Sequence, residues 1–167
     1  SFHDKYEVFE KIIDDYDWDF TQIQYNYIDE EYQAGTKGLE YAYKKGLGIV
    51  IMEPLRGGKL VNNLSDDIKD IIKFANTKKS PTKWAFKFLY NKSEIGVVLS
   101  GMSTMEQVIE NIKICDEEGK ANSMTKDEKK IIGNLGEKFK SKIKVDCTAC
   151  KYCIPCHICA FSHFNIH

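Results

Sequence analysis

The sequence predicts an α/β fold in which short parallel strands alternate with helices, and three observations lead to this expectation. Residues 20–25, 49–52 and 96–99 are short, mostly apolar and bounded by turn-forming residues, as buried strands are. The segments between them carry apolar residues at spacings of three and four, which is typical of helices with one buried face. Strands that alternate with helices pair in parallel through right-handed crossovers, and no further domain boundary is evident before about residue 142.

The composition fits one folded domain. Of the 167 residues, 43% are hydrophobic and 12% aromatic, which is enough for a core. The net charge of −1, from 24 basic and 25 acidic side chains, gives no basic excess for nucleic acid or for a membrane surface. The apolar runs are far shorter than the roughly 20 residues of a membrane span, and the first residues do not resemble a signal peptide. We expect a cytoplasmic protein and, because no Met begins the chain, one cut from a longer polypeptide.

The first helix is expected to follow Asp4 as its cap, and a second near residues 36–45 to end at Gly46. The strand between them contains Gln22 and Gln24, which is unusual for a core strand because a buried amide needs hydrogen-bond partners. Either these amides have partners or they face solvent at an edge of the sheet.

The second strand leads directly into a loop that contains Pro54, Gly57 and Gly58. Ligands of parallel α/β folds lie at the carboxyl ends of strands, and glycines there let backbone N–H groups approach phosphate oxygens. The loop is therefore a candidate phosphate-binding loop, although a plain turn between a strand and a helix has the same composition.

The third strand, expected to be buried, precedes a second candidate anion site. Ser103 and Glu106 have the spacing of a capping box, so a helix is expected to begin there with its free N–H groups directed at Gly101. Cys115 on this helix is expected to be a packed core thiol beside Ile112. Other helix starts are expected at Asp66-Asp67, at Ser80-Pro81 and at Thr125 with Glu128.

In this order and spacing, three segments resemble the second half of the aldo-keto reductase family. They are residues 20–26, the sequence Met-Glu-Pro-Leu-Arg-Gly-Gly at 52–58, and residues 99–111. Members of that family are (β/α)8 barrels that reduce carbonyl groups with NADPH. The resemblance implies that this chain is the C-terminal half of a TIM barrel, from the end of the fifth strand through the eighth. It divides the chain into a partial barrel, residues 1–141, and a short Cys-rich tail, residues 142–167.

The resemblance also implies a nucleotide site for NADP or NAD. Ser1 and Gln22 match residues that hydrogen-bond the nicotinamide carboxamide, and Met52 stands where many members stack a tyrosine on the nicotinamide. Gln107 replaces the arginine that usually binds the 2′-phosphate, which weakens a preference for NADPH and leaves NADH open. The remaining matched positions are Leu55 and Gly57 over the pyrophosphate, Gly101, Met102 and Ser103 at the adenosine phosphate, and Glu110 and Asn111 at the adenine.

No catalytic residue is assigned to the chain. The family's acid–base tyrosine and its Asp, Lys and His partners come from the first four strands, which are absent here, so the chain alone is not expected to reduce a carbonyl. His3 could face the nicotinamide as a proton donor, but a lone histidine there is more often structural. Half a barrel leaves sheet edges and an apolar face uncovered, so we expect self-association, or folding only with the missing N-terminal half.

Five cysteines recur at intervals of three residues in the tail, which is the kind of spacing that lets thiolates converge on one metal centre. The tail resembles the bacterial branch of the family in which the barrel continues into a ferredoxin-like segment with a 4Fe-4S cluster. Zinc is the alternative, because the fourth cysteine follows two residues rather than three and precedes His157 instead of a proline. The implied ligands are Cys147, Cys150, Cys153 and Cys156, and whether Cys159 or His157 takes part is open.

Two functions follow from these expectations. In the first, the chain contributes the nucleotide-binding half of an NAD(P)H-dependent, iron–sulfur oxidoreductase, in which the cluster exchanges electrons with a partner protein. In the second, it is a non-enzymatic metal-binding module for electron transfer or interaction, and the partial barrel is only a scaffold. Fold analogy does not separate the two, because function resides in the site.

Overall fold

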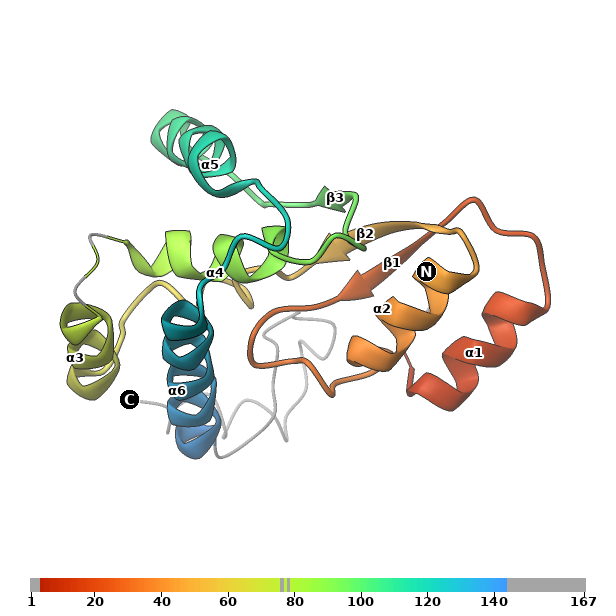
Figure 1. Cartoon of the computed structure of the whole chain (residues 1–167), viewed down its shortest axis with the longest axis horizontal. Coiled ribbons are helices and arrows are strands. Elements are labelled where there is room, and N and C mark those ends of the chain that lie inside the picture. The colour runs from red at the N-terminus through yellow and green to blue at the C-terminus, as the bar shows by residue number, and fades with distance from the viewer. Residues whose placement is uncertain (1–3, 76, 78, 144–167) are drawn as a thin grey trace, which may run out of the picture.

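A parallel three-stranded sheet lies at the centre of the computed structural model, which describes residues 4–75, 77 and 79–143 (Figure 1). The strands β1 (Phe20–Gln24), β2 (Gly48–Met52) and β3 (Val97–Val98) follow one another in the order β1-β2-β3. Gln24 lies opposite Met52, and Ile51 lies opposite Val98. The expected parallel α/β arrangement is confirmed, and the carboxyl ends of the strands share one edge.

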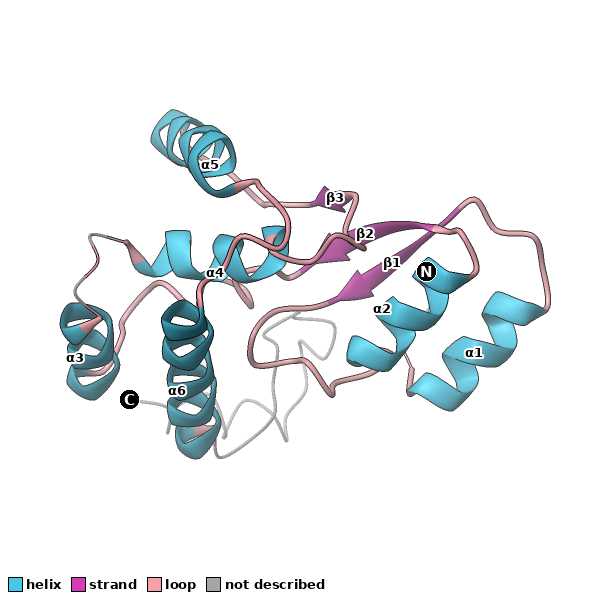
Figure 2. Ribbon diagram, in the orientation of Figure 1, coloured by secondary structure: helices cyan, strands magenta, loops and turns pink. Residues whose placement is uncertain are grey.

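Helices alternate with the strands, as Figure 2 shows by colour. Helices α1 and α2 lie side by side at one end of the molecule, and α3 and α6 lie side by side at the other (Figure 1). Helix α4 lies between these groups and also packs against α5. The helices are α1 (Tyr6–Asp14), α2 (Gly35–Lys44), α3 (Asp66–Phe74), α4 (Pro81–Tyr90), α5 (Met105–Glu118) and α6 (Lys126–Lys142).

The helix starts test the expected caps. Ser80 caps α4 by accepting a hydrogen bond from the Lys83 N–H, and Thr125 forms a capping box with Glu128, so both expectations are confirmed. At α5 the expected box of Ser103 and Glu106 is wrong by one residue. The cap is Thr104, which has an extended backbone. Its Oγ1 accepts a hydrogen bond from the Gln107 N–H, and the Gln107 side chain accepts one from the Thr104 N–H.

The first helix also begins differently from the expectation. Its cap position is Lys5, and no side chain there accepts a hydrogen bond from the helix. Asp4 instead accepts a hydrogen bond from the Lys5 N–H at 2.7 Å, so it acts one residue too early to cap the first turn. The spacing of three and four in this helix predicts one buried face; Phe9 and Ile13 are buried, whereas Tyr16, beyond the last turn, is exposed.

The core lies between the sheet and the helices that follow its strands. Ile49 and Ile51 of β2 are almost fully buried, and Trp84 and Leu89 of α4 pack into the same cluster. Tyr25, directly after β1, stacks on Phe88 of α4 with ring centroids 5.6 Å apart. Each of these large side chains contributes about 2 kcal/mol through burial. Helix α4 therefore contributes its buried face to the same core as the central strand.

The outer edge of the sheet and one face of α5 are exposed. Val97 and Leu99 retain 50% and 44% of their accessible surface, so the expectation that the third strand is buried is wrong. On α5, Met105, Ile109 and Ile112 are exposed at spacings of four and three. Cys115 is also exposed, so the expected core thiol is wrong as well. These exposures have one cause: within the described residues, β3 has β2 as its one strand partner, and α4 is the main helix packed against α5.

No helix in the described part of the chain combines the length and apolarity that crossing a membrane requires.

A buried cluster of charges joins the end of α5 to α4 and α6. Glu118, only 7% exposed, accepts hydrogen bonds from Lys79 and Lys87, and Lys87 Nζ lies 2.8 Å from its Oε2. Lys87 also donates to Ser123 Oγ at 2.7 Å, and Lys79 lies 3.4 Å from Glu128 of α6. Burial on its own would raise the pKa of Glu118, but the two ammonium groups lower it to about 2.

This cluster predicts a stability effect that depends on pH. Because the folded pKa of Glu118 lies below its ordinary value of 4.5, its contribution is fully present above about pH 4.5 and is lost as the pH falls toward 2. We expect Glu118→Gln to lower the free energy of unfolding at pH 7 by about 2 kcal/mol and to flatten its decrease in that pH window.

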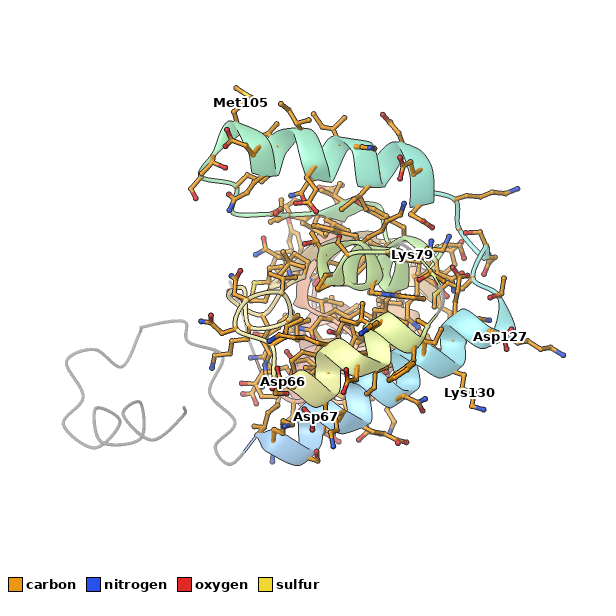
Figure 3. All side chains as sticks on the ribbon, turned by 90° about the vertical axis from the view of Figure 1, so that its left-hand side faces the viewer. Asp66, Asp67, Lys79, Met105, Asp127 and Lys130 are labelled. Carbon is orange, nitrogen blue, oxygen red and sulfur yellow. The ribbon has the colours of Figure 1, made fainter. Side chains whose placement is uncertain are left out.

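Urea unfolding between pH 2 and 7 measures the effect. The matched control is Asp66→Asn, which removes an exposed carboxylate paired with Lys69 (Figure 3) and is expected to change stability by less than about 0.5 kcal/mol. Equal losses in the two variants would contradict the assignment.

Candidate functional site

The edge where the strands end contains a pocket of about 550 Å³. It lies between the loop that follows β2, the segment that follows β3, and the first turns of α4 and α5. Both loops come from the carboxyl ends of neighbouring parallel strands, where ligands of α/β folds bind. The lining residues are Glu53, Pro54, Leu55, Gly57, Gly58, Val61, Asn62, Thr82, Leu99, Ser100, Gly101, Met102, Gln107, Glu110 and Asn111.

The loop after β2 is compact and has an unusual backbone. Glu53 and Arg56 adopt left-handed φ values of 56° and 49°, and Gly57 and Gly58 follow at 62° and 84°. At Gly58 a Cβ atom would lie 2.8 Å from the side-chain Nδ2 of Asn62. A residue other than glycine would therefore strain the left-handed backbone there and would have to displace the Asn62 side chain. Turn hydrogen bonds from the Arg56 N–H to Glu53 O and from the Gly58 N–H to Leu55 O close the loop at 3.0 and 2.9 Å.

The start of α5 forms the opposite wall. Gln107 Oε1 accepts hydrogen bonds from the Ser103 N–H at 2.8 Å and from the Thr104 N–H at 3.3 Å, so its amide belongs to the helix cap. Asn111 Nδ2 donates to Ser100 Oγ at 3.1 Å and thereby ties the helix to the segment after β3. The wall is therefore organised by its own side chains.

The expected nucleotide residues divide into three groups in space. Those that line the pocket are Leu55, Gly57, Gly101, Met102, Gln107, Glu110 and Asn111. Ser103 lies next to it through the hydrogen bond to Gln107, and Met52 ends β2 directly before the lining begins. Gln22 lies on the neighbouring strand, exposed, and donates from Nε2 to Met52 Sδ at 3.1 Å. Ser1 and His3 lie outside the described residues, as do the tail cysteines and His157.

The two glutamines of β1 have different environments. Gln22 is exposed, whereas Gln24 is 3% exposed and donates to Asp29 Oδ2 at 3.0 Å. Both alternatives from the sequence therefore occur, one in each residue. The two side chains lie on the same face of β1, since residues two apart in a strand do, but only Gln24, at the end of the strand, meets the Asp29 carboxylate.

The sequence analysis did not identify Thr82 and Asn62 as site residues. Thr82 belongs to the first turn of α4, which faces the same edge as the two loops. Asn62 lies at the end of the loop after β2, where its own N–H donates to Gly58 O at 2.9 Å. Ser80 and Pro81 correctly predict that a helix begins just before Thr82. The sequence spacing does not show that this helix start lies beside the two loops of the pocket.

The charges of the lining set its chemistry. The described lining residues include the carboxylates of Glu53 and Glu110 and no lysine or arginine. An anionic ligand would therefore be bound by backbone N–H groups, by polar side chains and by the positive end of α5. No group of three or more His, Cys, Asp or Glu side chains is placed to hold a metal within residues 4–75, 77 and 79–143.

The family model described as "Aldo/keto reductase family" matches residues 1–132. The chain is also similar to the solved structures of aldo-keto reductase AKR11C1 from Bacillus halodurans, with TM-scores of 0.61 for the apo form and 0.59 for the holo form. Both are 17% identical in sequence and cover 78% of this chain, which in turn covers 48% and 47% of theirs. The chain thus spans about half the length of these structures. No curated protein matches it.

Proposed function

Because the chain belongs to the aldo/keto reductase family, we propose that it is the C-terminal half of a (β/α)8 barrel and supplies the nucleotide-binding half of an oxidoreductase site. One observation carries the proposal. A single pocket is lined by Leu55 and Gly57 from one loop and by Gly101 and Met102 from the next, the positions that the family resemblance assigns to the two phosphate groups.

The exposed amide of Gln22 supports the nicotinamide end of the proposal. Its nitrogen donates to the sulfur of Met52, which is a weak acceptor, and the residue is exposed at the same edge of the sheet. The amide can therefore exchange this contact for a hydrogen bond to a carboxamide at little cost. Met52 offers its polarizable side chain to an aromatic ring in the same place.

The nucleotide, NADP or NAD, supplies hydride chemistry when it is bound. The residues of this chain bind and orient it, and we assign none of them to proton transfer. The loop after β2 and the amino end of α5 would hold the phosphates, because the positive partial charge of a helix N-terminus and of a glycine-containing loop stabilises an anion. A carbonyl substrate and the groups that act on it belong to the part of the barrel outside this chain.

A second function remains a candidate. The pocket lining carries two carboxylates and no cation among the described residues, which favours a scaffold that binds no dinucleotide. In that case the chain is a metal-binding module for electron transfer or interaction. The nucleotide titration below distinguishes the two functions.

We predict that the chain binds NADH or NADPH and that position 107 sets the balance between them. Gln107→Arg adds a cation beside the expected 2′-phosphate and should tighten NADPH binding by about tenfold while changing NADH by less than about twofold. Nucleotide fluorescence titration measures both dissociation constants. Gln107→Glu is the matched control, because glutamate preserves the capping box but adds a negative charge where the arginine variant adds a positive one. NADPH binding should therefore weaken. Absence of binding by either nucleotide supports the second function instead.

For the tail, we propose that Cys147, Cys150, Cys153 and Cys156 hold an iron–sulfur cluster. We predict that anaerobically purified protein is brown with an absorption band near ~400 nm, as thiolate-bound iron–sulfur clusters are. Cys150→Ser should remove the band, whereas Cys159→Ser should retain it if the fifth cysteine is not a ligand. A colourless protein that contains zinc would contradict the cluster and support the alternative metal.

We also propose that the exposed edge of β3 and the apolar face of α5 contact the missing half of the barrel. Figure 3 shows Met105 on the outer side of α5, directed away from α4. Without the missing half of the barrel, we predict that the chain self-associates through Ile109 and Ile112, which are 60% and 58% exposed. Sedimentation velocity should show oligomers that Ile109→Lys reduces and that Lys130→Glu, on exposed α6 surface, leaves unchanged. A wild-type chain that sediments as a monomer refutes this prediction.

A further inference from the structure

A buried polar network connects the segment after β1 to the loop after β2. Asp29, 3% exposed, accepts hydrogen bonds from Gln24 Nε2 at 3.0 Å and from Asn26 Nδ2 at 2.8 Å. Its Oδ2 also lies 3.4 Å from Nε of Arg56, and both side chains of this ion pair are 3% exposed. A buried charge pair of this kind costs desolvation, and removing one partner leaves the other as an uncompensated buried charge.

The network holds the two strained residues at the start of the loop. Within residues 53–58, Glu53 and Arg56 are the residues other than glycine with left-handed φ, a conformation that persists only when the surroundings enforce it. Asn26 Nδ2 donates to Glu53 O at 3.1 Å, and Asp29 pairs with Arg56. Each strained position thus has a buried partner on the neighbouring strand's loop.

The partner segment is itself fixed before it meets the loop. Asn26 Oδ1 accepts hydrogen bonds from the N–H groups of Ile28 and Asp29 at 3.0 and 3.1 Å, which closes a turn. The Tyr25 N–H donates to Met52 O at 3.2 Å and extends the strand pairing up to the loop. The hydrogen bonds of the network therefore fix the loop after β2 relative to this turn.

We infer that Asn26 and Asp29 are positioning residues that hold the loop of residues 53–58 in its ligand-binding shape before a ligand arrives. Neither residue lines the pocket, but the loop they hold contributes Leu55, Gly57 and Gly58 to it. A loop ordered in advance loses less conformational entropy when it binds a pyrophosphate, and affinity rises accordingly. The inference rests on the proposed function only in the identity of the ligand, a dinucleotide. How well the loop is ordered without a ligand is a separate property.

Two measurements on the full 167-residue chain test the inference. In Asn26→Ala and in Asp29→Asn, the amides of Arg56, Gly58 and Leu60, which close the loop, should exchange hydrogen at least tenfold faster. NADH or NADPH, whichever the wild type binds, should bind at least tenfold more weakly. In a Glu53→Gly background the loss caused by Asn26→Ala should fall below threefold, because glycine adopts the left-handed conformation unaided.

Matched controls separate positioning from general destabilisation. Glu118→Gln and Lys87→Gln each disrupt the buried charge cluster around Glu118, which lies outside the network. Both should lower the melting temperature while leaving loop exchange and nucleotide affinity within twofold of wild type. If Asp29→Asn does not fold, Arg56→Lys, which keeps the charge but loses the guanidinium, should still speed loop exchange beyond that of Glu118→Gln.

The outcomes are distinct. Unchanged loop exchange in Asn26→Ala and Arg56→Lys overturns the inference, whatever binds. Absence of nucleotide binding by the wild type overturns the proposed function, and hydrogen exchange then decides the inference by itself. Faster loop exchange with unaltered nucleotide affinity also overturns it, because the loop's order would then have no role in binding.

Discussion

The parallel ladder of β2 with its two neighbours is the constraint on which the rest of the structure depends. It aligns Gln24 with Met52 and Ile51 with Val98, so that the chain leaves every strand at the same edge. The loop after β2 and the segment after β3 are distant in sequence, and only this alignment brings Gly57 and Gly101 to one pocket. An antiparallel pairing of β3 would place the segment after it at the opposite edge of the sheet, away from the loop after β2.

Two buried charge systems stabilise different parts of this arrangement. The cluster around Glu118 lies where α4, the end of α5 and the start of α6 meet, away from the pocket lining. The network around Asp29 lies directly under the pocket loop. Both desolvate charged groups, so neither is a simple gain in stability. The first joins helices, whereas the second fixes a backbone shape that the loop sequence alone does not favour.

The sequence predicted features that depend on local chemistry. The alternation of strands and helices, the Ser80 cap and the box of Thr125 with Glu128 follow from residues close together in the chain, and all are present. The errors at Val97 and Cys115 have another origin. Apolar residues predict a face that is buried by another element, but they do not show whether that element belongs to the same chain. The cap at Thr104 was misplaced because Ser103 and Thr104 both have a suitable residue three positions later.

Features that depend on distant contacts were not predictable. Asn26 and Asp29 look like loop residues in the sequence, and their role emerges only when Arg56 is seen beside them. Thr82 reaches the pocket because the crossover after β2 returns α4 to the same edge. In each case the signal is a pairing between segments, which a single sequence does not record.

The pocket is built from segments that are neighbours in the described part of the chain. Every lining residue falls between Glu53 and Asn111, so the walls are built from two consecutive strand–loop–helix units and the amino end of α4. Such a site depends on contacts within the chain, because its walls follow neighbouring strands that are joined by the ladder of β2 with β3. Val97 of β3 and Met105, Ile109 and Ile112 of α5 are exposed, but none of them lines the pocket. The pocket and the exposed apolar surface are therefore separate features, so a change at Ile109 or Ile112 alters the surface without altering the lining.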